Sequence, residues 1–258
     1  MTAEAGENGQ GGHSQDTFIS HLIELRDRLL KCLYAIGIVA IPCIIYASSL
    51  YDFLAAPMQA ALPHGTKMIA TGVIAPFFIP LKVALLVAFG VALPYVLYQL
   101  WAFVAPGLYQ HEKKVVMPLI VSSTLLFYVG VAFCYFFVFR FVFSSIAQFA
   151  PQSISVAPDI ENYFNFVLGM FLAFGVAFET PVVVVVLVLA GVVKLSTLIE
   201  IRRYVIVGAF AVAAFVTPPD AVSMLALAIP LCILYEVGLL CARLVDKTPA
   251  ATAEETGN

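Results

Sequence analysis

The chain has 258 residues, of which 62% are hydrophobic and 11% are charged, and its mean hydropathy is +1.00. Ordinary soluble domains are about 45–50% apolar and about 25% charged. The composition therefore disfavours a soluble enzyme, a nucleic-acid-binding protein or a disordered scaffold, and it predicts a protein whose solvent is the lipid bilayer. The net charge of −3 adds little, because the positions of charges along a membrane chain are more informative than their total.

Both ends of the chain are polar. Residues 1–17 are rich in glycine and lack the basic start of a cleavable signal peptide, so they are predicted to be a disordered tail. Residues 246–258 are predicted to be a second disordered tail, which leaves residues 18–245 for the membrane domain.

Residues 16–31 have an amphipathic pattern. Apolar side chains recur at i, i+4, i+7 and i+11 from Phe18 onward, and charged side chains cover the rest of the helix surface. The pattern predicts a helix lying on or near the inner membrane surface. Glu24 in this helix has two interpretations, which are an i,i+4 ion pair with Arg28 and a binding role at the membrane surface.

An all-α membrane protein with six spanning helices is predicted from the charge-poor stretches. These stretches are residues 32–51, 75–104, 115–139, 162–193, 204–216 and 221–242. Prolines inside several of them predict kinked helices and a concave wall. The last two spans are predicted to be short, and residues 204–216 reach only about 20 Å as a helix, so they would thin the bilayer or pack against neighbouring helices.

Basic residues predict the orientation of these spans. With the N-terminus inside, ten of the 13 basic residues fall on the inner side: Arg26, Arg28, Lys31, Lys113, Lys114, Lys194, Arg202, Arg203, Arg243 and Lys247. The positive-inside rule then predicts that both termini are inside.

Glu112 lies in the loop between the second and third spans, on the predicted inner side. It could simply neutralise the adjacent Lys113. Alternatively, Glu24 and Glu112 together would suit a ligand with two guanidinium groups, because a carboxylate accepts the planar donor fork of arginine.

Glu179 lies inside the fourth span, where an ionised carboxylate costs at least roughly 2.5–3.5 kcal/mol. It is either a protonated or internally paired structural residue, or a polar site that faces a cavity, a partner helix or a proton path. Asp220, between the last two spans, is predicted to cap the N-terminus of the sixth helix.

Signals of enzymes and cofactors are missing from the sequence. The five cysteines lack metal-ligand spacing and lie in or beside apolar runs, so we expect no disulfide and no metal site. The sequence has no nucleotide-binding glycine loop and no Ser/His/Asp set. We therefore expect no cofactor and no enzymatic activity.

Five motifs, in this order along the chain, resemble those of the TatC family, whose members are subunits of the twin-arginine protein translocase. They lie at residues 20–26, 101–109, 111–114, 174–181 and 217–220, and the resemblance covers roughly residues 17–245. It implies a receptor and core scaffold that recognises twin-arginine signal peptides and exports folded proteins across the bacterial cytoplasmic membrane, using the proton-motive force.

The resemblance also assigns roles to single residues. It implies that Glu24 and Glu112 bind the two signal arginines beside Phe103, with Arg26 in the same entrance. It further implies an intramembrane transport role for Glu179. Partner-helix docking is implied for Thr217 and for the position of Met224, where family members often carry Gln. Pro57 is implied to lie in the first outer loop and Asp220 in the last one.

The implied partners are the single-span subunits TatB and TatA, signal peptides, the lipid bilayer and further copies of the chain in a multimeric complex. Both termini would be cytoplasmic. The alternative from the residues alone is a proton-coupled secondary transporter of small solutes with Glu179 as the proton carrier, although the six spans have no evident repeat.

Overall fold

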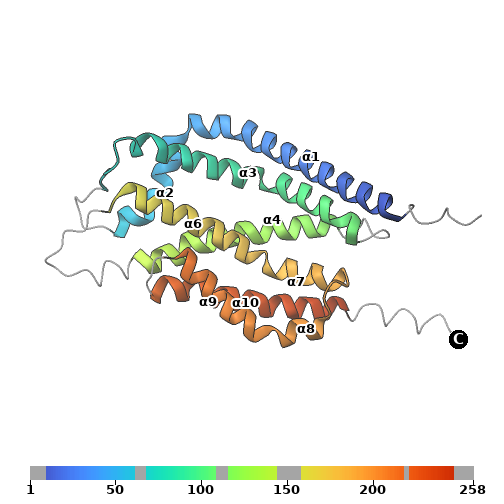
Figure 1. The fold of residues 1–258 in the computed structure, drawn as a ribbon. Coiled ribbons are helices and arrows are strands. Elements are labelled where there is room, and N and C mark those ends of the chain that lie inside the picture. The colour runs from blue at the N-terminus through green and yellow to red at the C-terminus, as the bar shows by residue number, and fades with distance from the viewer. Residues whose placement is uncertain (1–9, 62–67, 109–115, 144–157, 218–220, 247–258) are drawn as a thin grey trace, which may run out of the picture.

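The computed structural model describes residues 10–61, 68–108, 116–143, 158–217 and 221–246, and these residues form a helical bundle (Figure 1). The elements are α1 (Gln10–Ile45), α2 (Ala47–Ala61), α3 (Ala75–Leu108), α4 (Val116–Phe133), the π-helix η1 (Cys134–Val138), α6 (Ile160–Phe178), α7 (Thr180–Leu189), α8 (Leu195–Glu200), α9 (Arg202–Val216) and α10 (Ala221–Asp246). One isolated bridge, Ile69 with Asp159, lies outside the helices. The predicted all-α fold is confirmed over the described residues.

Five helical segments are long and apolar enough to cross a bilayer. They are Ile19–Ile45, Ala75–Phe103, Met117–Phe143, Ile160–Leu189 and Ala221–Leu244. The predicted fifth span corresponds to α9, whose 15 residues reach only about 22 Å. By contrast, α10 has 26 residues and is longer than the short sixth span that was predicted, because the helix continues beyond Ala242.

The first helix is longer than predicted. The amphipathic segment, residues 16–31, is continuous with the first span in α1, so it is not a separate helix on the membrane surface. α1 also begins at Gln10, within the predicted disordered tail. No proline or glycine interrupts the chain between residues 13 and 36, so the helix continues through the charged segment into the apolar one.

The segment between the first two membrane-crossing helices contains a second helix, α2. α1 contains Pro42, and the amide of Tyr46 donates to the carbonyl of Pro42 at the turn into α2. Pro57 therefore lies inside α2, half-buried, in the segment between the first two membrane-crossing helices. α2 packs on α3 and contributes Leu54 to the main apolar core.

The fourth span is broken at Glu179. α6 ends at Phe178, and α7 begins at Thr180 with a proline in its first turn. Pro181 has no amide hydrogen to continue the ladder of α6, which accounts for the break. The carboxylate thus lies at a helix junction inside the membrane domain.

The helices pack in a simple order across the bundle. α1 lies along α3, α4 along α6, and α7 along α10 (Figure 1). α4 and α6 approach closely where a Cβ on Gly130 would lie 2.6 Å from the Phe174 carbonyl oxygen. The start of α1 and the end of α10 lie at the same end of the bundle (Figure 1), as an even number of spans requires.

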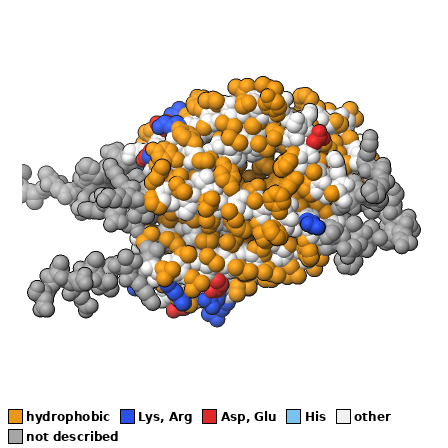
Figure 2. Space-filling model, turned by 180° about the vertical axis from the view of Figure 1, so that it is seen from behind, with side chains coloured by type: hydrophobic (Ala, Val, Ile, Leu, Met, Phe, Trp, Pro, Cys, Tyr) orange, Lys and Arg blue, Asp and Glu red, His pale blue; other side chains and the backbone are white. Residues whose placement is uncertain are grey.

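Charged side chains lie mostly near the ends of a hydrophobic surface (Figure 2). Large apolar residues remain exposed along the described spans, for example Leu29, Ile38, Phe136 and Leu240. A soluble protein rarely exposes so much apolar surface. The surface is therefore suited to contact with lipid, as the composition predicts.

Candidate functional site: a carboxylate pocket between α1 and α3

Glu24 and Phe103 both lie next to His21, where the N-terminal part of α1 lies beside the C-terminal part of α3. The ring of His21 stacks on Phe103 with centroids 4.3 Å apart. His21 and Glu24 share a helix face, and His21 Nδ1 lies 4.0 Å from Glu24 Oε2. The antiparallel packing of the two helices thus brings together two residues that are far apart in the sequence.

Glu24 is already paired. Arg28 Nε and Nη2 both donate to Glu24 Oε1, at 2.9 and 2.7 Å. The i,i+4 pair that was one of the two interpretations of Glu24 is therefore observed. Arg28 Nη1 also donates to Gln99 Oε1 on α3 at 3.3 Å, which extends the network across the two helices.

A polar cavity of about 540 Å³ lies at this network. Its lining includes the side chains of Glu24, Asp27, Arg28, Lys31, Tyr98 and Gln99. Arg26 is exposed on α1, two residues from Glu24. Glu112 lies outside the described residues, so its position relative to Glu24 stays a prediction.

Glu179 takes part in a second polar network, inside the membrane domain. Ser123 Oγ donates to Glu179 Oε2 at 2.6 Å, and the indole of Trp101 donates to Ser123 Oγ at 3.1 Å. Glu179 Oε1 is buried and has no hydrogen-bond partner among the described residues. One of the interpretations from the sequence was an internally paired Glu179, and such pairing is observed for the Oε2 atom. The Oε1 atom is left able to accept a further hydrogen bond.

The predicted docking residues lie close to the protein core. Thr217 is buried, and its hydroxyl donates to the Ala213 carbonyl at 2.8 Å. Met224 is half-buried and packs against the main apolar core. The exposed residues of the last turns of α9 are apolar, with Phe215 96% exposed. Asp220 lies outside the described residues, directly before the first residue of α10.

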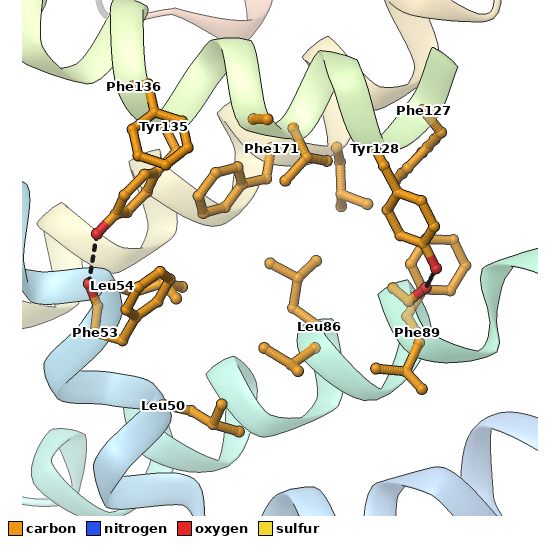
Figure 3. Close-up of a pocket in the computed structure, with 16 residues that line it drawn as sticks. Leu50, Phe53, Leu54, Leu86, Phe89, Phe127, Tyr128, Tyr135, Phe136 and Phe171 are labelled. Atoms are coloured by element: carbon orange, nitrogen blue, oxygen red, sulfur yellow. Dashed lines mark hydrogen bonds between the residues drawn. The ribbon is translucent and has the colours of Figure 1, made fainter. Parts of the chain in front are cut away.

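An apolar cavity of about 400 Å³ opens among α2, α3, α4, η1 and α6 (Figure 3). Leu50, Leu86 and Phe171 are among its lining residues. The hydroxyl groups of Tyr128 and Tyr135 donate to the carbonyls of Gly90 and Phe53, at 2.8 and 3.0 Å. Because these two hydroxyls are already satisfied, the cavity is suited to an apolar occupant.

Three residues of these networks were missed by the sequence analysis. Gln99, Ser123 and Trp101 carry no charge, and no local pattern connects them to Glu24 or Glu179. Glu236 on α10 is a further residue that the sequence analysis did not single out, and its Oε1 lies 2.7 Å from Arg202 Nε. That pair joins α9 to α10, and its two residues are 34 positions apart in the chain, far beyond the i,i+3 and i,i+4 spacings that a helical pattern could reveal.

Comparisons with known proteins show which family the chain is related to. The family model described as Sec-independent protein translocase protein (TatC) matches residues 20–230. The chain belongs to the TatC family. TatC of Haemophilus influenzae is 48% identical over 225 residues, covering 87% of this chain and 88% of the relative. TatC of Escherichia coli strain K12 is 46% identical over 225 residues, covering 87% of each chain.

A solved structure confirms the fold of this TatC-family chain. A crystal structure of the twin-arginine translocase receptor TatC matches with a TM-score of 0.78 and 36% sequence identity, covering 88% of this chain and 100% of the other. These matches support a multi-pass membrane subunit of the protein translocase over the small-solute transporter that the sequence left open.

Proposed function

We propose that this chain binds twin-arginine signal peptides at the inner ends of α1 and α3. Glu24 and Glu112 accept the two guanidinium groups, Phe103 packs beside them, and Arg26 helps to form the same entrance. The observation that carries the proposal is that Glu24, which lines the polar cavity, and Phe103 both lie beside His21. His21 Nδ1 is 4.0 Å from Glu24 Oε2, and the ring centroids of His21 and Phe103 are 4.3 Å apart. The matched crystal structure is described as a twin-arginine translocase receptor.

The chemistry of the cavity supports this choice of ligand. A carboxylate at a partly desolvated site accepts two parallel donors from a guanidinium, whereas an ammonium offers only a point charge. Glu24 is 39% exposed, so a peptide can reach it. Glu112 follows the last residue of α3 by four positions, which is close enough in the chain to serve the same entrance.

The apolar cavity supplies a second contact for the same ligand in this proposal. A signal peptide carries an apolar segment after its arginines. That segment would gain about 25 cal/mol for each square ångström of apolar surface that it buries, and the cavity among α2, α3, α4 and α6 presents aromatic and aliphatic side chains to it (Figure 3).

The rest of the proposal concerns partners and energy. TatB or TatA docks along α9, near Thr217 and Met224, where the helix is short and its outer surface apolar. Glu179 acts in transport after the signal has bound. Transport uses the proton-motive force and no catalytic step by this chain, and several copies assemble in the cytoplasmic membrane of a bacterium with both termini in the cytoplasm. The basic residues at the start of α1 and the end of α10 favour that orientation.

Photo-crosslinking of a signal peptide tests the binding site. The full chain is reconstituted in lipid, and probes placed beside Glu24 and Glu112 are exposed to a twin-arginine peptide or to its twin-lysine counterpart. The twin-arginine peptide should label the sites strongly, and Glu112→Lys should abolish the labelling. Equal labelling by both peptides, or labelling that survives Glu112→Lys, would contradict the proposal.

A further inference from the structure

We propose that Arg28 occupies the Glu24 carboxylate while no signal peptide is bound, and that a signal arginine binds this carboxylate by displacing Arg28. The inference rests on the proposed function. The observation that supports it is that one oxygen atom accepts two hydrogen bonds from Arg28. Nε and Nη2 of Arg28 both donate to Glu24 Oε1, at 2.9 and 2.7 Å. The donor fork that an incoming arginine would offer is therefore already supplied by the chain itself.

Helix geometry holds Arg28 in this place. Residues four apart lie on the same face of an α-helix, so Arg28 stays next to Glu24 whenever α1 is formed. Glu24 Oε2 is less engaged, because its distance of 4.0 Å from His21 Nδ1 exceeds that of a hydrogen bond. An incoming guanidinium can therefore first contact Oε2 and then compete for Oε1.

Gln99 gives the displaced arginine a second acceptor. Arg28 Nη1 donates to Gln99 Oε1 at 3.3 Å, through a nitrogen that the Glu24 pair does not use. Gln99 is buried, with 6% of its surface exposed, so its position is set by α3. Arg28 can leave Glu24 without losing every partner, which lowers the cost of displacement.

The pair is also weak enough to exchange. The side chains of Arg28 and Glu24 are 22% and 39% exposed, and ion pairs with this much contact to water contribute little. A ligand that satisfies Glu24 better than Arg28 does can replace it.

Occupation by Arg28 has a defined effect on affinity. When only a fraction of the sites is free, the apparent affinity of every ligand falls to that fraction of its intrinsic value. A twin-lysine peptide begins from a weaker intrinsic affinity, because an ammonium lacks the planar fork. Arg28 is thus a residue that acts through Glu24 to lower the affinity of both peptides by the same factor, and the preference for arginine over lysine comes from the Glu24 carboxylate itself.

The test measures peptide affinity for the full chain in lipid nanodiscs. The probes are a synthetic peptide with an Arg-Arg pair before an apolar segment and its Lys-Lys counterpart. Arg28→Gln should strengthen binding of both peptides by the same factor, about two- to fivefold, and leave their ratio unchanged. Arg28→Lys, which keeps the charge but removes the fork, should give a smaller gain.

Two controls separate displacement from other effects. Lys31→Gln removes one positive charge from the lining of the same cavity, so a gain equal to that of Arg28→Gln would reduce the effect to bulk charge and overturn the inference. In a Glu24→Gln background, Arg28→Gln should bring no gain, because the contested carboxylate is gone. A persistent gain there would also overturn it.

The two proposals fail in different ways. If Glu24→Gln leaves twin-arginine binding at wild-type strength, the proposed binding site is wrong. If Glu24→Gln weakens binding but neither Arg28→Gln nor Arg28→Lys strengthens it, only the displacement inference is wrong.

Discussion

The hydroxyl of Ser123 donates a 2.6 Å hydrogen bond to Glu179 Oε2 across the interface between α4 and the α6–α7 junction. Because the indole of Trp101 donates to the same hydroxyl oxygen, the single proton of Ser123 is directed toward the carboxylate. One oxygen of Glu179 is thereby fixed, while Oε1 keeps its capacity to accept a bond. Ser123 therefore fixes the orientation of the Glu179 carboxylate, so that Oε1 is available to accept a hydrogen bond from a partner.

Ser123→Ala should therefore lower transport while signal-peptide binding survives. The bond to a carboxylate at a buried site is worth about 1.5 kcal/mol or more, which corresponds to roughly a tenfold effect. Transport of a twin-arginine cargo into inverted membrane vesicles is the measurement, with peptide affinity determined in parallel. Glu179→Ala should show the same separation with a larger loss.

A neighbouring hydroxyl provides the matched control. Ser122 donates to the Leu119 carbonyl of its own helix and does not contact Glu179, so Ser122→Ala should transport cargo at close to the wild-type rate. Unchanged transport in both Ser123→Ala and Glu179→Ala would return Glu179 to a purely structural role.

Glycine packing between α4 and α6 gives a stability prediction. A Cβ on Gly130 would lie 2.6 Å from the Phe174 carbonyl oxygen and 2.9 Å from Phe178 Cβ, and neither atom can move without shifting a helix. Gly130→Ala should destabilise the chain by about 1–3 kcal/mol. The measurement is thermal or denaturant unfolding in detergent, compared with Gly169→Ala on α6, where a Cβ meets no atom within 4 Å. Equal stability of the two variants would refute the close approach.

The sequence predicted local features of the site better than its contacts. Glu24 and Arg28 are one helical turn apart, so their pairing follows from spacing alone. Glu179 was identified because a carboxylate is costly in an apolar stretch. Their other partners, Gln99 and Ser123, are 71 and 56 residues away. Only the packing of α1 on α3 and of α4 on α6 brings them close.

The predicted ends of the helices were less accurate than the predicted all-α fold class. Spans were delimited by charges, but a charge near the membrane surface does not end a helix. α1 therefore runs through the charged residues before Cys32, and α10 continues past Arg243. The continuity of α1 has a consequence for function, because it places Glu24 on the same rigid helix as the first span.

The ion pair between Arg202 and Glu236 predicts a small coupling between α9 and α10. Arg202 Nε lies 2.7 Å from Glu236 Oε1, but the side chains are 44% and 42% exposed, so water screens the pair. A double-mutant cycle with Arg202→Gln and Glu236→Gln should give a coupling of about 0.5 kcal/mol in unfolding experiments. Arg203 stacks on Tyr204 instead, and a cycle of Arg203→Gln with Glu236→Gln should give a coupling near zero. Comparable coupling in the two cycles would contradict the pairing.

Asp159 predicts how acid affects the end of the bundle at which α3 and α6 begin. Its carboxylate accepts bonds from the Thr71 hydroxyl at 2.8 Å and from the Thr71 and Asn162 amides at 3.1 Å. The Thr71 hydroxyl, followed by the Asn162 amide, holds the pKa of Asp159 below its ordinary value of 3.8. These bonds join the segment before α3 to the start of α6.

Because the folded-state pKa is depressed, the ionised form contributes its full stabilisation above the unfolded value, near pH 4. That contribution should fall progressively as the pH drops below about 4 and through the lowered pKa. Hydrogen exchange at the Thr71 amide, followed from pH 6 down to pH 3 and corrected for the intrinsic exchange rate, should show protection decreasing in this range. Asp159→Asn, which keeps an acceptor oxygen but does not titrate, should remove the pH dependence, and a decrease of the same size in that variant would assign it to another group.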